Sequence, residues 1–139
     1  MDCIFCKIVK GEIPSKKIFE DEKVFVFLDI KPMAKGHCLI IPKQHFENIF
    51  DAPEEILKEV IFATKKVVSL LQKSLGVDGV NIFNNNGKTA EQSIFHLHFH
   101  ILPRYENDGL SILNWMLEKT KEVDQEELKK LAEQIKNSN

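Results

Sequence analysis

The sequence predicts an α+β protein in which an antiparallel sheet packs on one long helix. Several short segments rich in β-branched and aromatic residues surround a single helical pattern of about two dozen residues. The connection between the first two clear strands is too short for a helical crossover, so these strands should pair antiparallel. The 139 residues contain no repeat and no linker, which predicts one domain over residues 1–139.

Five segments are predicted as strands. Pro32 and Gly36 mark the loop between the second and the third strand, and Pro103 should close the last one. The Asn-Asn-Asn-Gly run at 84–87 is typical of a loop, because Asn and Gly tolerate left-handed backbone. The predicted strands cover residues 16–20, 23–28, 37–41, 79–83 and 94–102.

Two helices are expected. The long one should begin at a capping box formed by Asp51 and Glu54, with Pro53 in its first turn, and end at Gly76. A second, amphipathic helix should cover 124–136 and carry its own capping box, Asp124 with Glu127. Its apolar stripe consists of Leu128, Leu131, Ala132 and Ile135.

Composition and charge exclude several classes of function. Nineteen basic and 21 acidic residues leave a net charge of −2, which gives no bulk attraction to nucleic acid or to an anionic membrane. The chain has no apolar run near the roughly 20 residues of a membrane span, and it does not start with a basic segment followed by an apolar one. A cytoplasmic protein with neither nucleic-acid nor membrane partners is therefore expected.

The cysteines suggest metal chemistry. Cys3 and Cys6 form a C-x-x-C pair, which in a reducing compartment indicates a metal or redox site rather than a structural disulfide. A thioredoxin-type redox pair normally follows a strand, and none precedes this one, so a metal is favoured over redox chemistry. Cys38 lies in an apolar stretch and is expected to be a small core residue.

Three histidines alternate with apolar residues at 96–100. On a strand, His96, His98 and His100 would share one face, about 6.6 Å apart from one to the next, while the other face joins the core. A helix would scatter the three imidazoles. The row allows three explanations: a solvated sheet face, a metal site, or acid–base and nucleophilic catalysis.

The last two explanations are compatible with each other. Two cysteines and two of the five histidines would make a closed tetrahedral zinc site, which is structural, and three histidines would remain for chemistry. The residues alone do not say which two bind the metal.

The segment His96-Leu97-His98-Phe99-His100-Ile101-Leu102 matches the signature of the histidine triad family, and the chain resembles that family over about residues 2–105. Further similarity lies at residues 27–45, at Asn85 and at Gln92-Ser93. The opening Cys-Ile-Phe-Cys-Lys-Ile is similar to zinc-carrying bacterial members. Residues 106–139 would be a C-terminal extension of the single domain.

The resemblance implies a five-stranded antiparallel sheet, a homodimer, and a hydrolase of purine nucleoside 5′-phosphoramidates or related adenylated compounds. It implies that His98 attacks the α-phosphorus and forms a nucleotidyl-histidine. His100 would contact the phosphate and assist protonation of the leaving group, and His37 would orient the imidazoles. The alternatives are a dinucleoside polyphosphate hydrolase and a nucleotide- or zinc-binding interaction module with little turnover.

The resemblance also assigns the binding residues. Asp29 would bind the ribose hydroxyls, and the phosphate and leaving group would be held by Asn85, Gln92 and Ser93. The base slot would be lined by Phe5, Ile8, Phe27 and Ile30, and the zinc ligands would be Cys3, Cys6, His45 and His96. One departure stands in the phosphate-side loop, where Glu91 replaces a usual glycine and could repel an anionic leaving group.

Overall fold

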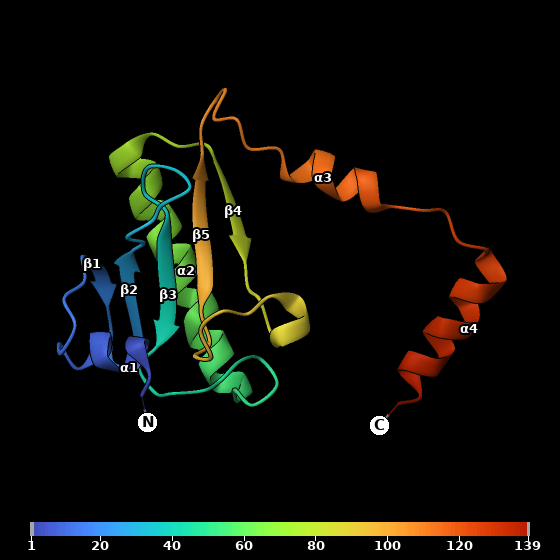
Figure 1. The fold of residues 1–139 in the computed structure, drawn as a ribbon, viewed down its shortest axis with the longest axis horizontal. Coiled ribbons are helices and arrows are strands. Elements are labelled where there is room, and N and C mark those ends of the chain that lie inside the picture. Colours follow the sequence, from blue (N-terminus) through green and yellow to red (C-terminus); the bar gives the residue numbers. More distant parts are fainter. Residues whose placement is uncertain (1, 139) are drawn as a thin grey trace. The chain divides into compact units, whose positions relative to one another are not determined.

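Five strands form one antiparallel sheet in the order β1-β2-β3-β5-β4 (Figure 1). The predicted fold class and strand number are confirmed. The strands are β1 (Lys17–Glu20), β2 (Val24–Leu28), β3 (Cys38–Pro42), β4 (Gly79–Phe83) and β5 (Phe99–Arg104). This computed structural model describes residues 2–138, which divide into two compact units, residues 2–108 and residues 109–138.

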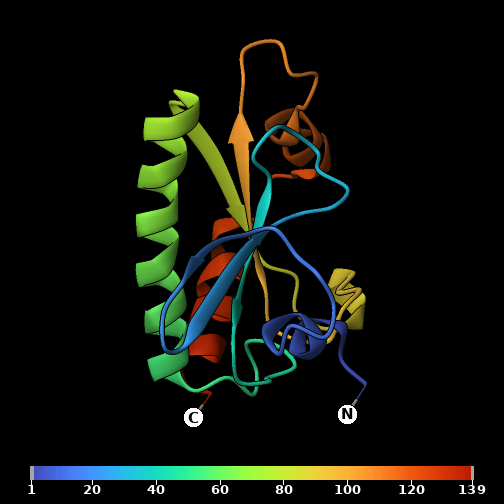
Figure 2. The ribbon, with the colours of Figure 1, turned by 90° about the vertical axis from the view of Figure 1, so that its left-hand side faces the viewer.

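The sheet of the first unit lies between two helices, α1 (Ile4–Val9) and α2 (Glu54–Leu75), as Figure 2 shows. Alternation along β2 and β3 directs Val24, Val26, Cys38 and Ile40 into the core beneath α2. The intervening residues of the same strands pack with α1 in a second core cluster: Phe25, Phe27, Leu39 and Ile41. Burial on both faces explains why these strands are continuously apolar.

The last strand differs from the prediction. Residues 94–96 form a bend, and the strand begins only at Phe99, so just one of the three alternating histidines lies within it. Pro103 lies inside β5 instead of ending it. Pairing of β5 with β3 stops at the Cys38–Ile101 pair, so the missing N–H of Pro103 interrupts no ladder on that side.

The long helix has the predicted end but not the predicted start. Gly76 closes α2 in the left-handed conformation, with φ of 67°. Pro53 occupies the position before the helix, and no side chain caps it. The carboxylate of Asp51 instead accepts hydrogen bonds from the backbone N–H groups of Glu47 and Asn48, and so stabilises the preceding turn.

The second unit contains α3 (Ile112–Lys119), which the sequence did not predict, and α4 (Gln125–Lys136), which it did. Asp124 precedes α4, but its side chain does not cap the helix. Both helices expose apolar side chains within this unit, among them Trp115, Met116, Leu131 and Ile135. None of the helices formed by residues 2–138 is long and apolar enough to cross a membrane.

Candidate active site and metal centre

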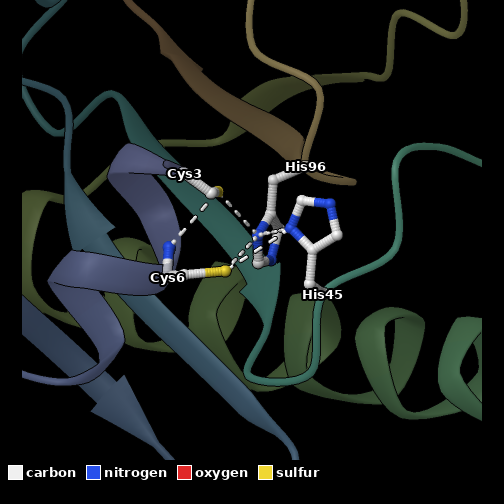
Figure 3. Close-up of side chains that lie close together, drawn as sticks. All are labelled: Cys3, Cys6, His45 and His96. Carbon is white, nitrogen blue, oxygen red and sulfur yellow. Dashed lines mark hydrogen bonds between the residues drawn. The ribbon is translucent and has the colours of Figure 1, made fainter. Parts of the chain in front are cut away.

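Four side chains from three separate parts of the chain converge beside α1, as Figure 3 shows; we name them the Cys2His2 group. Cys3 caps α1 and Cys6 lies within it, His45 follows β3, and His96 lies in the bend before β5. Their ligand atoms, the two Sγ and the two Nδ1, all lie within 4.8 Å of one another. All four metal ligands that the family resemblance implied are therefore neighbours.

The spacing of these atoms fits a tetrahedral zinc ion. Zinc bonds of about 2.0–2.3 Å would separate the ligand atoms by roughly 3.3–3.8 Å. His96 Nδ1 lies 3.4 Å from Cys3 Sγ, 3.5 Å from Cys6 Sγ and 3.2 Å from His45 Nδ1. Cys6 Sγ lies 3.4 Å from His45 Nδ1. The two sulfurs and two nitrogens are thus a suitable donor set at suitable distances.

The backbone prepares His96 for this role. Its Nε2 lies 2.8 Å from the Pro42 carbonyl oxygen, which can only accept, so the ring proton must be on Nε2. Nδ1 therefore keeps its lone pair and faces the other three ligand atoms. A hydrogen bond of this kind, made by the second ring nitrogen, is the usual support of a metal-binding histidine.

The other three histidines, His37, His98 and His100, form what we call the imidazole row. The ring centres of His98 and His100 are 5.3 Å apart, and those of His37 and His100 are 5.2 Å apart. His98 Nδ1 donates to the backbone carbonyl of His96 over 2.7 Å. The proton of neutral His98 is therefore on Nδ1, and Nε2 carries the lone pair that a nucleophile needs.

A chain of hydrogen bonds fixes the other two rings in the opposite way. The backbone N–H of Met33 donates to His37 Nδ1 over 3.1 Å, so His37 carries its proton on Nε2. The Nε2–H of His37 donates to His100 Nδ1 over 2.9 Å, which leaves the His100 proton on Nε2. The row thus offers a lone pair on His98 and an N–H donor on His100.

Burial keeps these rings neutral. It lowers the pKa of His98 and of His37 below the ordinary value of 6.5, and it lowers the pKa of His100 to about 4. In each case burial is the largest cause, since the charged imidazolium loses its hydration. Near neutral pH, His98 therefore carries an available lone pair, as a nucleophile requires.

A cavity of about 250 Å³ opens beside the row. Its lining includes eight predicted site residues: Phe5, Ile8, Phe27, Asp29, Ile30, Ser93, His98 and His100. Asp29 follows β2, and its carboxylate accepts from the backbone N–H of Lys31 over 2.8 Å. Ile30 is 87% exposed, so it lies at the rim rather than in the floor of the slot.

Gln92 and Asn85 are not among the lining residues. Gln92 is buried, and its side-chain oxygen accepts from Asn48 and from the backbone of Gly87. Its amide nitrogen donates to the carbonyls of Glu47 and Ile94. These four bonds make Gln92 a brace between the two loops beside the site. Asn85 is half-buried in the loop between β4 and the short helix η1 (Lys88–Ala90).

Two residues that contact the imidazole row were not predicted from the sequence. Phe83 stacks on His100 with ring centres 4.4 Å apart and 11° between the planes. Asn84 donates to the backbone carbonyl of His98 over 2.7 Å. The pairing of Phe83 with His100 follows from strand register, which the sequence does not give. For Asn84 the only available signal was its place at the end of a predicted strand.

Glu91 adopts a left-handed conformation, with φ of 61°, at the end of η1. A residue with a Cβ is sterically strained in that conformation, whereas glycine is not. This backbone geometry gives a physical reason why a glycine suits the position.

Asp29, His37 and His100 also lie close enough together to hold a metal, with Asp29 Oδ2 3.8 Å from His37 Nε2. The hydrogen bonds argue for a different use. Binding a metal through His37 Nε2 would move the ring proton to Nδ1, where it would meet the N–H of Met33. The three groups are better suited to positioning protons.

The fold is an antiparallel α+β fold, and it places the imidazole row at a cavity and the Cys2His2 group next to it. This combination defines a class of proteins that have a histidine-lined binding site and a candidate metal centre. The HIT domain matches residues 10–107, and the chain belongs to the HIT family. An uncharacterised HIT-like protein of Methanocaldococcus jannaschii is 55% identical over 107 residues, which cover 77% of this chain and 82% of that protein. The adenosine 5′-monophosphoramidase of Saccharomyces cerevisiae is 41% identical over 133 residues, covering 96% and 80%.

Solved structures of HIT (histidine triad) family members have the same fold as this chain. A HIT family member from Bacillus subtilis has a TM-score of 0.89 at 38% identity, and the match covers 100% of this chain and 98% of that one. A zinc-bound histidine triad protein from Mycobacterium smegmatis has a TM-score of 0.76 at 38% identity, covering 91% and 87%. The predicted family is thereby confirmed.

Proposed function

We propose that this protein hydrolyses purine nucleoside 5′-phosphoramidates or related adenylated compounds at the α-phosphate, through a nucleotidyl-histidine. One observation carries the proposal: neutral His98 keeps its Nε2 lone pair at the wall of a cavity in which His100 offers an N–H. The similarity to a yeast enzyme named adenosine 5′-monophosphoramidase supports the choice of substrate class.

The reaction has two displacements at phosphorus. His98 Nε2 attacks the α-phosphorus, and the phosphorus–nitrogen bond breaks with its electron pair on the leaving amine, which takes up a proton with the help of His100. Water then attacks the same phosphorus and releases a proton to the solvent. The bond to His98 breaks with its electron pair on Nε2, which restores the neutral imidazole and releases the nucleoside monophosphate. The His100 N–H stabilises charge on a phosphate oxygen in both steps.

The cavity walls suit the rest of such a substrate. Phe5, Ile8 and Phe27 supply apolar and aromatic surface for a base, and the Asp29 carboxylate can accept hydrogen bonds from ribose hydroxyls. Ser93 stands at the same cavity and can hold the phosphate side. Gln92 contributes indirectly, by bracing the loop that leads to Ser93.

We further propose a structural zinc at the Cys2His2 group and a homodimer. The donor set and its spacing, together with the zinc-bound relative, support the metal. Exposed Ile61 and Phe62 on α2 support a partner surface in the first unit. Sedimentation of the wild type and of a Phe62→Lys variant tests the dimer: the variant should sediment as a monomer.

The decisive experiment is mass spectrometry of protein quenched shortly after mixing with adenosine 5′-phosphoramidate. An adenylyl adduct is expected on the peptide that contains His98, and His98→Asn should give none. Turnover without any adduct, or an adduct elsewhere, would contradict the mechanism. Parallel assays with a dinucleoside polyphosphate decide between the two hydrolase substrates.

A further inference from the structure

The short helix α1 belongs to both sites at once. Cys3, which caps α1, and Cys6, which lies within it, contribute the two sulfurs of the Cys2His2 group (Figure 3). Ile4, Phe5 and Ile8 of the same helix line the cavity. A displacement of α1 that breaks the Cys2His2 group must therefore also displace one wall of the cavity.

α1 cannot hold itself in place. A helix of six residues is far below the length at which isolated helices become stable in water. What fixes it is the apolar packing of Phe5 and Ile8 against the sheet, and the contacts of its two sulfurs with His45 and His96. Cys3 Sγ also accepts the backbone N–H of Cys6 over 3.4 Å, which ties the first turn to the metal-ligand atom itself.

Phe5 connects the two groups directly. Its ring makes T-shaped contacts with His96, with ring centres 5.8 Å apart, and with His98, with ring centres 5.2 Å apart. One of these histidines belongs to the Cys2His2 group and the other to the imidazole row. The same phenyl ring thus contacts both a candidate metal ligand and the proposed nucleophile.

We infer that metal binding at the Cys2His2 group and nucleotide binding in the cavity are thermodynamically linked through α1, with Cys3 and Cys6 as positioning residues of the nucleotide cavity. The inference rests on the proposed nucleotide site. Bonds from zinc to all four ligand atoms would tie Cys3 and Cys6, and so α1, to His45 and His96. Without zinc, the packing of Phe5 and Ile8 alone must hold α1. α1 then opens more often, and nucleotide binding must first close the cavity wall.

Linkage is reciprocal, which sharpens the expectation. If zinc tightens nucleotide binding by some factor, nucleotide must tighten zinc binding by the same factor. Couplings of this kind between two sites usually amount to about 5- to 150-fold. Saturating nucleotide should therefore also raise the chelator concentration that removes half of the zinc at equilibrium.

The test is calorimetric titration of AMP into the full chain, once loaded with zinc and once stripped by a chelator. Stripping should weaken AMP binding by at least about 5-fold. Equal affinity in both forms would overturn the linkage and leave the proposed function intact. Failure of AMP to bind the zinc-loaded form would instead contradict the proposed nucleotide site.

Two variants and one local measurement complete the design. Cys6→Ser should reproduce the weaker AMP binding, whereas Cys38→Ala, which alters a buried cysteine on the α2 side of the sheet, should not. Hydrogen exchange should rise at residues 4–9 on stripping while α2 stays protected. Loss of protection throughout the sheet as well would overturn the local coupling, because zinc would then be holding the whole fold.

Discussion

His96 and His98 are two residues apart and chemically identical, yet the structure prepares them for opposite tasks. His96 donates Nε2–H to the Pro42 carbonyl and turns its Nδ1 lone pair towards two cysteines and His45. His98 donates Nδ1–H to the His96 carbonyl and keeps its lone pair on Nε2 at the cavity. Which backbone carbonyl each ring meets decides which nitrogen is available, and so which chemistry is possible.

The bend at residues 94–96 makes this difference possible. On a regular strand, both rings would stand on one face with similar surroundings. The bend lets His96 reach the Cys2His2 group, while His98 and His100 remain in the imidazole row.

Replacing His98 and His96 one at a time should have the largest effects, because each variant should lose a different function. His98→Ala should lower phosphoramidate turnover on the order of 10⁴-fold or more, because no other lone pair replaces the nucleophile. Zinc content and AMP affinity should stay close to those of the wild type. Turnover assays and elemental analysis of the same preparation measure both, and substantial residual turnover would refute the role of His98.

His96→Gln should show the reverse pattern. Loss of one metal ligand should lower zinc affinity by more than about 100-fold, since even losing a hydrogen-bond partner of a metal ligand costs roughly 10- to 100-fold. Competition with a chromogenic chelator gives the affinity, with His45→Gln as the matched variant on the other imidazole ligand. A His96→Gln protein that keeps its zinc would remove His96 from the ligand set.

Acid should destabilise the protein through the imidazole row. Burial lowers the pKa of His100 to about 4 and that of His37 below 6.5, so the unfolded chain takes up protons that the folded chain refuses. Their effect is absent above about pH 6.5, and stability falls as the pH drops from there towards about 4. Urea midpoints across this range should fall less steeply in His100→Gln; an identical slope would exclude His100 as a cause.

Glu91→Gly should have the smallest effect, a gain of about 1 kcal/mol in the free energy of unfolding. Glycine removes the strain of the left-handed conformation, with φ of 61°. Glu91→Gln keeps that strain and should leave stability unchanged, while it isolates the effect of the charge on anionic leaving groups. Urea denaturation distinguishes the two variants, and a stabilisation by Gln as large as that by Gly would argue against backbone strain.

Most elements could be predicted because their signals are local. Continuous β-branched and aromatic runs marked β2 and β3, and Gly76 marked the end of α2. The failures are equally physical. Asp51 was expected to cap α2, but it caps the turn before it, because several backbone N–H groups compete for one carboxylate. α1 was missed since a six-residue helix has no independent periodic signal.

The candidate site, too, was predicted where the signal is local and was not predicted where it depends on distant residues. The spacing of Cys3 and Cys6 indicated a metal, and the alternating histidines indicated either a metal or catalysis, but nothing local could divide the histidines between the two. Gln92 was expected at the phosphate. What the sequence did not predict is that its four hydrogen bonds join two loops, a role that depends on residues more than 40 positions away.

The sequence by itself determined the residue types, the antiparallel α+β architecture and the family. The tertiary structure alone decided which nitrogen of each imidazole is available, because that choice depends on carbonyls and N–H groups brought there by other segments, such as Pro42 and Met33. It also decided that one short helix serves both the Cys2His2 group and the cavity, because only folding brings His45 and His96 to the two cysteines.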